Sequence, residues 1–182
     1  MLLTLSRLSP EKAQHRLLQA VQYAEKSGRI PHDLTVVIAG APAFMEGEKH
    51  ARRLKKIAKT LKTRVVFPGH VGGIEKAAWY QLATLFVVNS LHESYGLTTL
   101  EAMQQGCPVV AVRSFGTADT VGPKVGRLVP PGPDIEIRLW GNIELLFDGN
   151  LEEMSREARA FAQINSFDRA ALEVRNALES LS

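Results

Sequence analysis

Short apolar runs alternate with helical patterns along this 182-residue chain, and this alternation limits its fold more than any other feature. The apolar runs are nearly continuous and rich in β-branched residues, which is typical of strands that a parallel sheet buries on both faces. They occupy residues 2–6, 34–39, 64–67, 85–89, 108–112 and 126–129. The helical patterns fall near residues 11–27, 47–61, 74–82, 98–105, 134–147, 151–163 and 168–181. The sequence therefore predicts an α/β fold with a doubly wound parallel sheet of about six strands, helices on both faces and a helical C-terminal segment.

Length and composition are those of a globular protein with one domain over residues 1–182. Hydrophobic residues make up 45% of the chain and charged residues 23%, with no run of about 18 apolar residues that could span a bilayer. The N-terminus also lacks the basic leader and long apolar run of a signal peptide. The lone cysteine, Cys107, excludes an internal disulfide framework, and we expect it to be a buried core thiol in a reducing, cytoplasmic setting.

Basic residues concentrate between Lys49 and Arg64, where the chain has no acidic residue. Such a cluster could bind phosphates or an anionic membrane surface. Apolar residues, however, recur through the same segment at helical spacing, at positions 51, 54, 58 and 61. We therefore favour the interpretation that the cations form the solvated side of an amphipathic helix. The net charge of +3 is too small to indicate a nucleic-acid partner.

Ligands of open parallel sheets bind beyond the carboxyl ends of the strands. Several of the loops expected there carry glycine next to a predicted helix start, which lets the backbone approach a ligand and favours an anion. The G-x-G-x-x-G and Walker phosphate-binding motifs are nevertheless absent. The histidines show no metal-ligand spacing, and no acidic cluster resembles a divalent-cation site. We expect a phosphorylated ligand that is bound without a metal.

Two cations, Arg7 and Lys12, flank the turn that follows the first predicted strand. One ends the strand and the other begins the following helix, so both are placed to meet the charge of a diphosphate at that edge of the sheet. The alternative is that each is an ordinary solvated surface cation.

Two carboxylates, Glu93 and Glu101, lie on either side of Gly96 in the segment ESYGLTTLE. Thr98 and Glu101 fit a T-x-x-E capping box, in which Glu101 only stabilises the start of a helix. A binding role for Glu101 is compatible with this, because a cap would fix where its carboxylate points.

Two segments resemble motifs of the GT-B retaining glycosyltransferases, the large family that includes bacterial glycogen synthases and sucrose-phosphate synthases. ESYGLTTLE is similar to that family's E-x7-E region, and SRLSPEK, residues 6–12, is similar to its R-x-x-x-x-K turn. Residues 67–71 and 115–119 also fall where related motifs occur. The resemblance covers essentially the whole chain and implies one Rossmann-like domain, the donor-binding C-terminal half of a GT-B architecture, with the N-terminal acceptor domain absent.

The resemblance implies transfer of a sugar from a nucleotide diphosphate sugar to an acceptor hydroxyl, with retention at the anomeric carbon and no cofactor. Arg7 and Lys12 would neutralise the leaving diphosphate in place of a metal ion. Glu93 would face the donor sugar, and Glu101 would accept hydrogen bonds from two vicinal ribose hydroxyls. The phosphate and sugar hydroxyls would be held around Ser94, Tyr95, Gly96, Leu97 and Thr98. The isolated domain would bind the nucleotide without turning over.

The chain departs from the family pattern at several places, and two other functions stay open. Ala13 follows Lys12 where the family often has glycine, and Ser94 and Tyr95 replace the residues of the common E-G-F-G. A nucleotide-sugar 2-epimerase shares the GT-B architecture, and a non-catalytic nucleotide-binding module would also alternate strands with helices. A receiver-type module would need an acidic pocket after its first strand, where this chain has Ser6 and Arg7.

Overall fold

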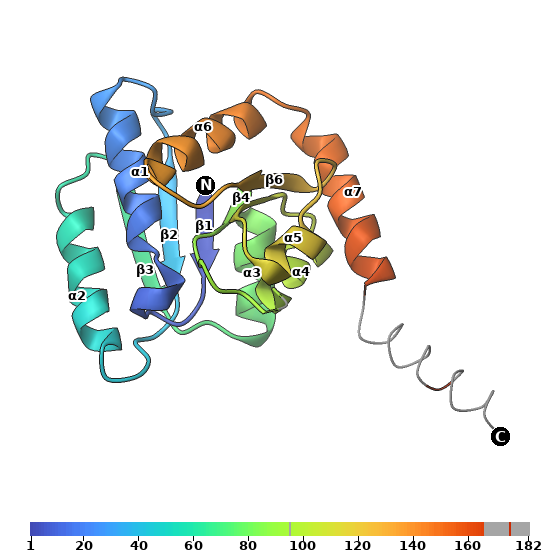
Figure 1. Ribbon diagram of the computed structural model, residues 1–182, viewed down its shortest axis with the longest axis horizontal. Helices are drawn as coiled ribbons and strands as arrows, with labels where there is room; N and C mark the ends of the chain where they lie inside the picture. The colour runs from blue at the N-terminus through green and yellow to red at the C-terminus, as the bar shows by residue number, and fades with distance from the viewer. Residues whose placement is uncertain (95, 166–174, 176–182) are drawn as a thin grey trace.

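The computed structural model describes residues 1–94, 96–165 and 175 of the chain (Figure 1). Within that part, six strands form one sheet in the order β3-β2-β1-β4-β5-β6, and all neighbouring strands are parallel. The strands are β1 (Leu2–Leu5), β2 (Thr35–Ala39), β3 (Arg64–Gly69), β4 (Leu85–Val88), β5 (Val109–Val112) and β6 (Gly126–Val129). The doubly wound α/β fold predicted from the sequence is confirmed.

The helices connect these strands and cover the sheet. They are the 3₁₀ helix η1 (Pro10–Lys12) and the α-helices α1 (His15–Lys26), α2 (Gly47–Ala58), α3 (Gly73–Leu82), α4 (Leu97–Gln104), α5 (Phe115–Thr120), α6 (Ile135–Phe147) and α7 (Leu151–Ile164). The helix expected near residues 168–181 lies outside the described residues except for Arg175. The sequence analysis did not predict α5.

The first helix begins later than the sequence predicted, at His15 rather than near residue 11. Ala13 ends η1 in the left-handed region, with φ of 50°. An α-helix of L-residues cannot continue through that conformation. The turn that carries Lys12 is therefore a separate element from α1.

Two apolar clusters pack against opposite faces of the sheet and explain why the strands are apolar throughout. Leu2, Leu85 and Val87 point toward α1, α2 and α6, whereas Leu3, Phe86 and Val88 point toward α3, α4 and α7. Because successive side chains of a strand alternate between faces, a strand covered on both sides needs an apolar residue at every position. The result is a three-layer domain (Figure 1).

The strand order reverses between β1 and β4. From β1 the chain winds outward through β2 to β3, then returns to place β4 on the other side of β1, with Leu2 paired to Leu85 and Leu3 to Phe86. The following helices cover opposite faces, so a crevice opens between the carboxyl ends of these two strands. This crevice is where the fold places a ligand.

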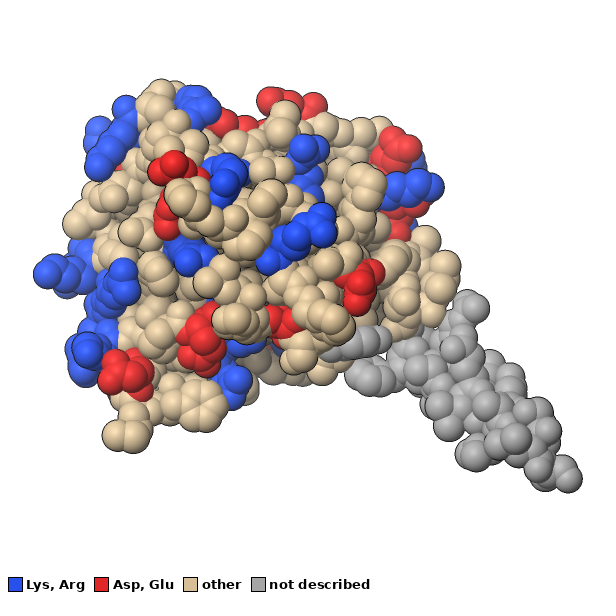
Figure 2. All heavy atoms as spheres, viewed as in Figure 1, with Lys and Arg blue, Asp and Glu red and all other residues tan. Residues whose placement is uncertain are grey.

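Helix α2 has the amphipathic character that the sequence predicted. His50, Ala51 and Leu54 are buried, and the cations from Lys49 to Arg64 are exposed. Figure 2 shows Lys and Arg side chains along the edge of the molecule where α2 lies. Among the helices in the described ranges, none has the length and apolar character needed to cross a membrane.

Cys107 is buried, as predicted, and its burial raises the pKa of the thiol to about 12. A thiol with so high a pKa is protonated and unreactive at neutral pH. Cys107 is therefore a core residue, and the cytoplasmic setting inferred from its being the lone cysteine stays a prediction.

Candidate functional site

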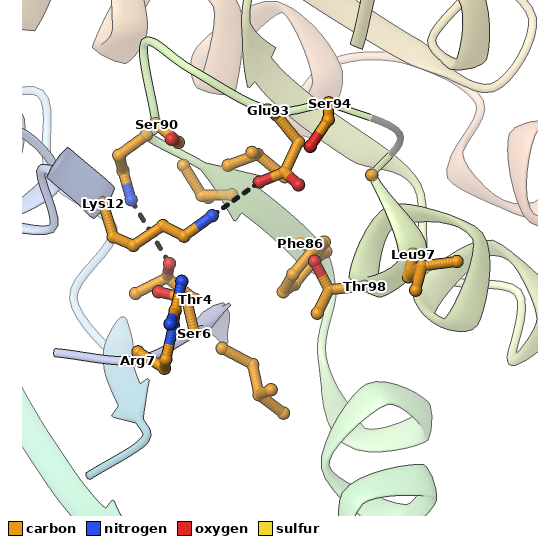
Figure 3. Close-up of a pocket in the computed structure, with 15 residues that line it drawn as sticks. Thr4, Ser6, Arg7, Lys12, Phe86, Ser90, Glu93, Ser94, Leu97 and Thr98 are labelled. Atoms are coloured by element: carbon orange, nitrogen blue, oxygen red, sulfur yellow. Dashed lines mark hydrogen bonds and ion pairs between the residues drawn. The ribbon is translucent and has the colours of Figure 1, made fainter. Parts of the chain in front are cut away.

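A cavity of about 300 Å³ lies at the carboxyl ends of β1 and β4, where the strand order reverses (Figure 3). Its size is at the lower end of the range found for small-molecule sites. The residues that line it come from three places: the end of β1 with its following turn, the end of β4 with its following loop, and the start of α4. They are Thr4, Leu5, Ser6, Arg7, Lys12, Phe86, Val87, Val88, Asn89, Ser90, Glu93, Ser94, Gly96, Leu97 and Thr98.

The turn after β1 supplies both predicted cations. Lys12 Nζ lies 2.8 Å from Glu93 Oε2, so this ion pair joins the turn after β1 to the loop after β4 (Figure 3). The guanidinium of Arg7 lies over the ring of Phe44, 4.7 Å from its centroid. This contact holds the Arg7 side chain at the mouth of the cavity by a cation–π interaction. Both cations line the cavity, as expected.

Helix α4 starts at the opposite wall of the cavity. Gly96 precedes the helix with φ of 79°, a left-handed conformation that glycine adopts without strain. Within the described residues no side chain caps this helix, so its first N–H groups are available to a ligand. A helix N-terminus with free N–H groups favours an anion such as a phosphate.

The capping box expected for Thr98 and Glu101 is wrong. The helix begins at Leu97, so Thr98 is its second residue rather than the residue that precedes it. The T-x-x-E pattern therefore falls inside the first turns, where Thr98 cannot act as a cap. Thr98 instead lines the cavity.

Glu101 lies apart from the residues that line the cavity. One of its carboxylate oxygens accepts a hydrogen bond from Lys76 at 2.6 Å, and the other accepts one from the hydroxyl of Tyr80 at 3.1 Å. Burial raises the pKa of Tyr80, and the negative charge of Glu101 raises it further, so the tyrosine stays a donor. These contacts fix the carboxylate, and its role toward a ribose stays a prediction. The sequence analysis identified neither Lys76 nor Tyr80.

Four of the five remaining residues predicted to bind the donor line the cavity. Ser94, Gly96, Leu97 and Thr98 line the cavity, whereas Tyr95 lies outside the described residues. The loop that carries them is held from both sides: the hydroxyl of Ser90 donates to the carbonyl of Glu11, and the N–H of Gly116 donates to the carbonyl of Glu93 at 2.7 Å. Gly116 belongs to α5, so the helix that sequence reasoning missed supports the site.

A short-range signal for α5 is present in the sequence. Ser114 and Thr117 form a reciprocal cap at its start, in which each side chain meets the backbone or side chain of the other. The usual capping box has Glu or Gln at the second position, so Ser114 and Thr117 form a less common variant of this helix start.

Metal-binding groups do not gather in the part of the chain that the structure describes. No three His, Cys, Asp or Glu side chains in it are placed to hold a metal ion. The metal-free binding expected from the sequence stays a prediction.

Comparison with known proteins identifies the family of this chain. Residues 1–161 match the sequence profile described as "Glycosyl transferases group 1". The chain belongs to the group 1 glycosyltransferases.

Several glycosyltransferases are similar in sequence to this chain. The D-inositol 3-phosphate glycosyltransferase of Frankia alni is 37% identical over 139 residues, which are 74% of this chain and 33% of that protein. The enzyme of the same name from Streptomyces griseus is 32% identical over 174 residues, or 91% of this chain and 36% of that protein. The chain thus spans about a third of the length of the curated relatives it matches.

Solved glycosyltransferase structures share the fold. HepE of Anabaena, solved in complex with UDP and glucose, superposes with a TM-score of 0.81 at 26% identity, covering 98% of this chain and 48% of that one. Sucrose-phosphate synthase from Thermosynechococcus elongatus gives a TM-score of 0.80 at 27% identity, covering 99% of this chain and 45% of that one. The chain spans about half the length of these structures, and the expected half of a GT-B architecture is confirmed.

Proposed function

We propose that this group 1 glycosyltransferase chain is a donor-binding domain, which holds a nucleotide diphosphate sugar whose sugar is transferred to an acceptor hydroxyl. The observation that carries the proposal is the cavity between β1 and β4, where two cations, a carboxylate and an uncapped helix start converge. HepE, which shares the fold, was solved with UDP and glucose and with UDP-glucose. The proposal places the same class of ligand in this cavity.

The diphosphate would lie between the turn after β1 and the start of α4. Arg7 and Lys12 would supply positive charge, and the first N–H groups of α4 would donate hydrogen bonds. As the bond to the sugar breaks, negative charge grows on the departing diphosphate, and fixed cations stabilise it. We propose on this basis that no metal ion is needed.

The sugar would lie near Glu93 and Ser94, which line the cavity above Lys12 in Figure 3. A carboxylate at that place can accept hydrogen bonds from sugar hydroxyls. Glu101, held by Lys76 and Tyr80, would meet the ribose. Retention of configuration and the acceptor hydroxyl come from the family resemblance and are part of the proposal.

The two rival functions find less support. The named relatives are glycosyltransferases rather than epimerases. A receiver-type module requires acidic residues after β1, and this chain places Ser6 and Arg7 there. A nucleotide-binding module without transfer activity would have the same donor cavity, and the named glycosyltransferase relatives favour a transferase over it.

Calorimetric titration with UDP, GDP and ADP, and then with the corresponding nucleotide sugars, tests the proposal. The buffer contains EDTA throughout. We expect at least one nucleoside diphosphate to bind under these conditions. Binding that appears only after magnesium or manganese is added would contradict the metal-free part of the proposal. The absence of any nucleotide binding would contradict the proposal as a whole.

A further inference from the structure

Behind the turn that carries Arg7 and Lys12 lies a buried side chain that the proposed function does not use. Gln14 has an exposed fraction of 0%, and its amide group reaches back across the turn. Its Nε2 donates to Ser6 Oγ and to the carbonyl of Arg7, each at 2.8 Å. Gln14 therefore joins the two ends of the segment on which both cations lie.

A second buried side chain holds the first. His50 of α2, with an exposed fraction of 4%, has its Nε2 2.8 Å from Gln14 Oε1. The carbonyl of Arg7 can only accept, which fixes Nε2 of Gln14 as the atom facing the turn and Oε1 as the atom facing His50. Since Oε1 can only accept, His50 Nε2 must carry a hydrogen. The orientation of the whole chain of hydrogen bonds follows from one carbonyl.

We infer that Gln14 and His50 are positioning residues that hold Arg7 and Lys12 in the arrangement needed to bind a diphosphate. The inference rests on the proposed function and goes beyond it, because neither side chain lines the cavity. Gln14 acts on the turn directly, and His50 acts by fixing the orientation of the Gln14 amide. The chain of contacts runs from α2, through the start of α1, to the end of β1.

Part of the turn is held by backbone bonds to the loop after β2: the N–H of Leu8 donates to the carbonyl of Ala41, and the carbonyl of Leu8 accepts from the N–H of Ala43. The internal hydrogen bonds of the turn run from Lys12 to Ser9 and from Ala13 to Pro10, and they organise only its second half. Ala13 also holds a left-handed conformation that is unfavourable for alanine. The carbonyl of Arg7, next to the cation itself, is tied by Gln14. A buried amide whose bonds are all made specifies one arrangement.

The first test replaces Gln14 by Met, which keeps the length of the side chain and removes its hydrogen bonds. The affinities of a nucleoside diphosphate and of its monophosphate are measured by calorimetry. We expect the ratio of the two affinities to fall at least fivefold, because the second phosphate depends most on the two cations. Ile143→Val, a core change in α6 away from the cavity, serves as the control for lost stability. It should lower the melting temperature and leave the ratio unchanged.

A pair of variants at His50 tests the indirect role. His50→Leu removes the donor to Gln14, whereas His50→Gln can restore it through its own amide. We expect His50→Leu to lower the affinity ratio and His50→Gln to recover most of it. Equal ratios in the two variants and the unchanged chain would overturn the role of His50.

Hydrogen exchange without nucleotide separates a failure of this inference from a failure of the proposed function. In Gln14→Met, the amides of Leu8, Lys12 and Ala13 should exchange at least tenfold faster than in the unchanged chain, while those of α6 keep their rates. Unchanged exchange in the turn would overturn the inference even if nucleotides bind. Faster exchange in the turn of a chain that binds no nucleotide would support the positioning of the turn and contradict the proposed function.

Discussion

Lys12 and Glu93 are separated by 81 residues in the sequence, yet Lys12 Nζ lies 2.8 Å from Glu93 Oε2 across the crevice. Both side chains are largely shielded, with exposed fractions of 17% and 19%. Lys12, one of the two cations that a diphosphate would meet, is therefore already paired with a carboxylate. A bound donor would have to share Lys12 with Glu93, and the two residues would act on different parts of it.

Replacing Glu93 by Gln should separate these two effects. The change releases Lys12, so a nucleoside diphosphate should bind as tightly as before or more tightly. The sugar-bearing donor loses a charge-assisted hydrogen bond, which is worth about 1.5–3 kcal/mol, and should bind about tenfold or more weakly. The measurement is a pair of titrations, one with each ligand. Equal weakening of both ligands would show that Glu93 does not act on the sugar.

Replacing Lys12 or Arg7 by Gln should weaken the binding of the nucleoside diphosphate by about tenfold or more, because each change removes a cation that lines the cavity. Lys12→Gln should have the larger effect, since it also leaves Glu93 unpaired beside the phosphates. Lys124→Gln is the matched control, because Lys124 is exposed and its contact with Glu157 is long, at 3.8 Å. Calorimetry should show no change for the control. A Lys12→Gln variant with unaltered affinity would make Lys12 an ordinary surface cation.

Replacing Glu101 by Gln tests the ribose role. The contact with Lys76 is partly exposed, so its loss should lower the free energy of unfolding by no more than about 1 kcal/mol. Nucleoside diphosphate affinity should fall about tenfold, because a ribose hydroxyl loses its bond to a charged acceptor. The deoxynucleotide lacking one ribose hydroxyl provides the control: it keeps only one of the two bonds to Glu101, so the substitution should weaken its binding less than that of the ribonucleotide. Equal losses for the ribo- and deoxynucleotides would assign Glu101 to structure alone.

Replacing Gly96 by Ala should disturb the start of α4. An L-residue at a φ of 79° is unfavourable by about 1–2 kcal/mol, and the added Cβ would lie 3.2 Å from Thr99 Oγ1. We expect lower stability and weaker diphosphate binding. Gly141→Ala, inside α6 where a Cβ meets nothing within 4 Å, should instead raise stability by roughly 0.5–1 kcal/mol. Thermal unfolding should therefore show a lower melting temperature for Gly96→Ala and a higher one for Gly141→Ala than for the unchanged chain.

His15 should make stability depend on pH. Burial, together with the positive charge of Arg53, lowers the pKa of His15 from an ordinary value of 6.5 to about 4. Folding therefore favours the neutral ring. The stabilisation that His15 contributes to the folded state is complete above pH 6.5 and is lost as the pH falls toward 4. We expect a loss of roughly 2 kcal/mol over that range, allowing for solvent screening of a half-buried ring. His15→Gln should remove this part of the pH dependence, and His32→Gln, at an exposed position, should leave it in place.

The sheet could be predicted from the sequence because each strand is covered on both sides. Leu85 and Phe86 are consecutive, and they enter different apolar clusters, so the run needs no polar position. Arg7 and Lys12 could be singled out as well, since the end of a strand is visible in the same pattern.

The contacts between these residues could not be predicted in the same way. The pairing of Lys12 with Glu93 depends on β4 lying beside β1. The hydrophobic pattern predicts where strands occur but not their order in the sheet. The T-x-x-E pattern was misleading because Gly96, rather than Thr98, precedes α4. Gln14 and His50 are polar residues buried by contacts between elements, and nothing local distinguishes them from exposed ones.

Mapping the nucleotide on the chain by amide chemical shifts tests the central claim most directly. The ¹⁵N-labelled chain is titrated with the nucleoside diphosphate that binds best, in the presence of EDTA. A ligand between β1 and β4 should shift the amides of Lys12, Glu93 and Gly96 most, together with those of the first turn of α4. Shifts that instead cluster at another surface, such as the one where Arg29, in the loop after α1, pairs with Glu144 of α6, would contradict the assignment of this cavity as the donor site.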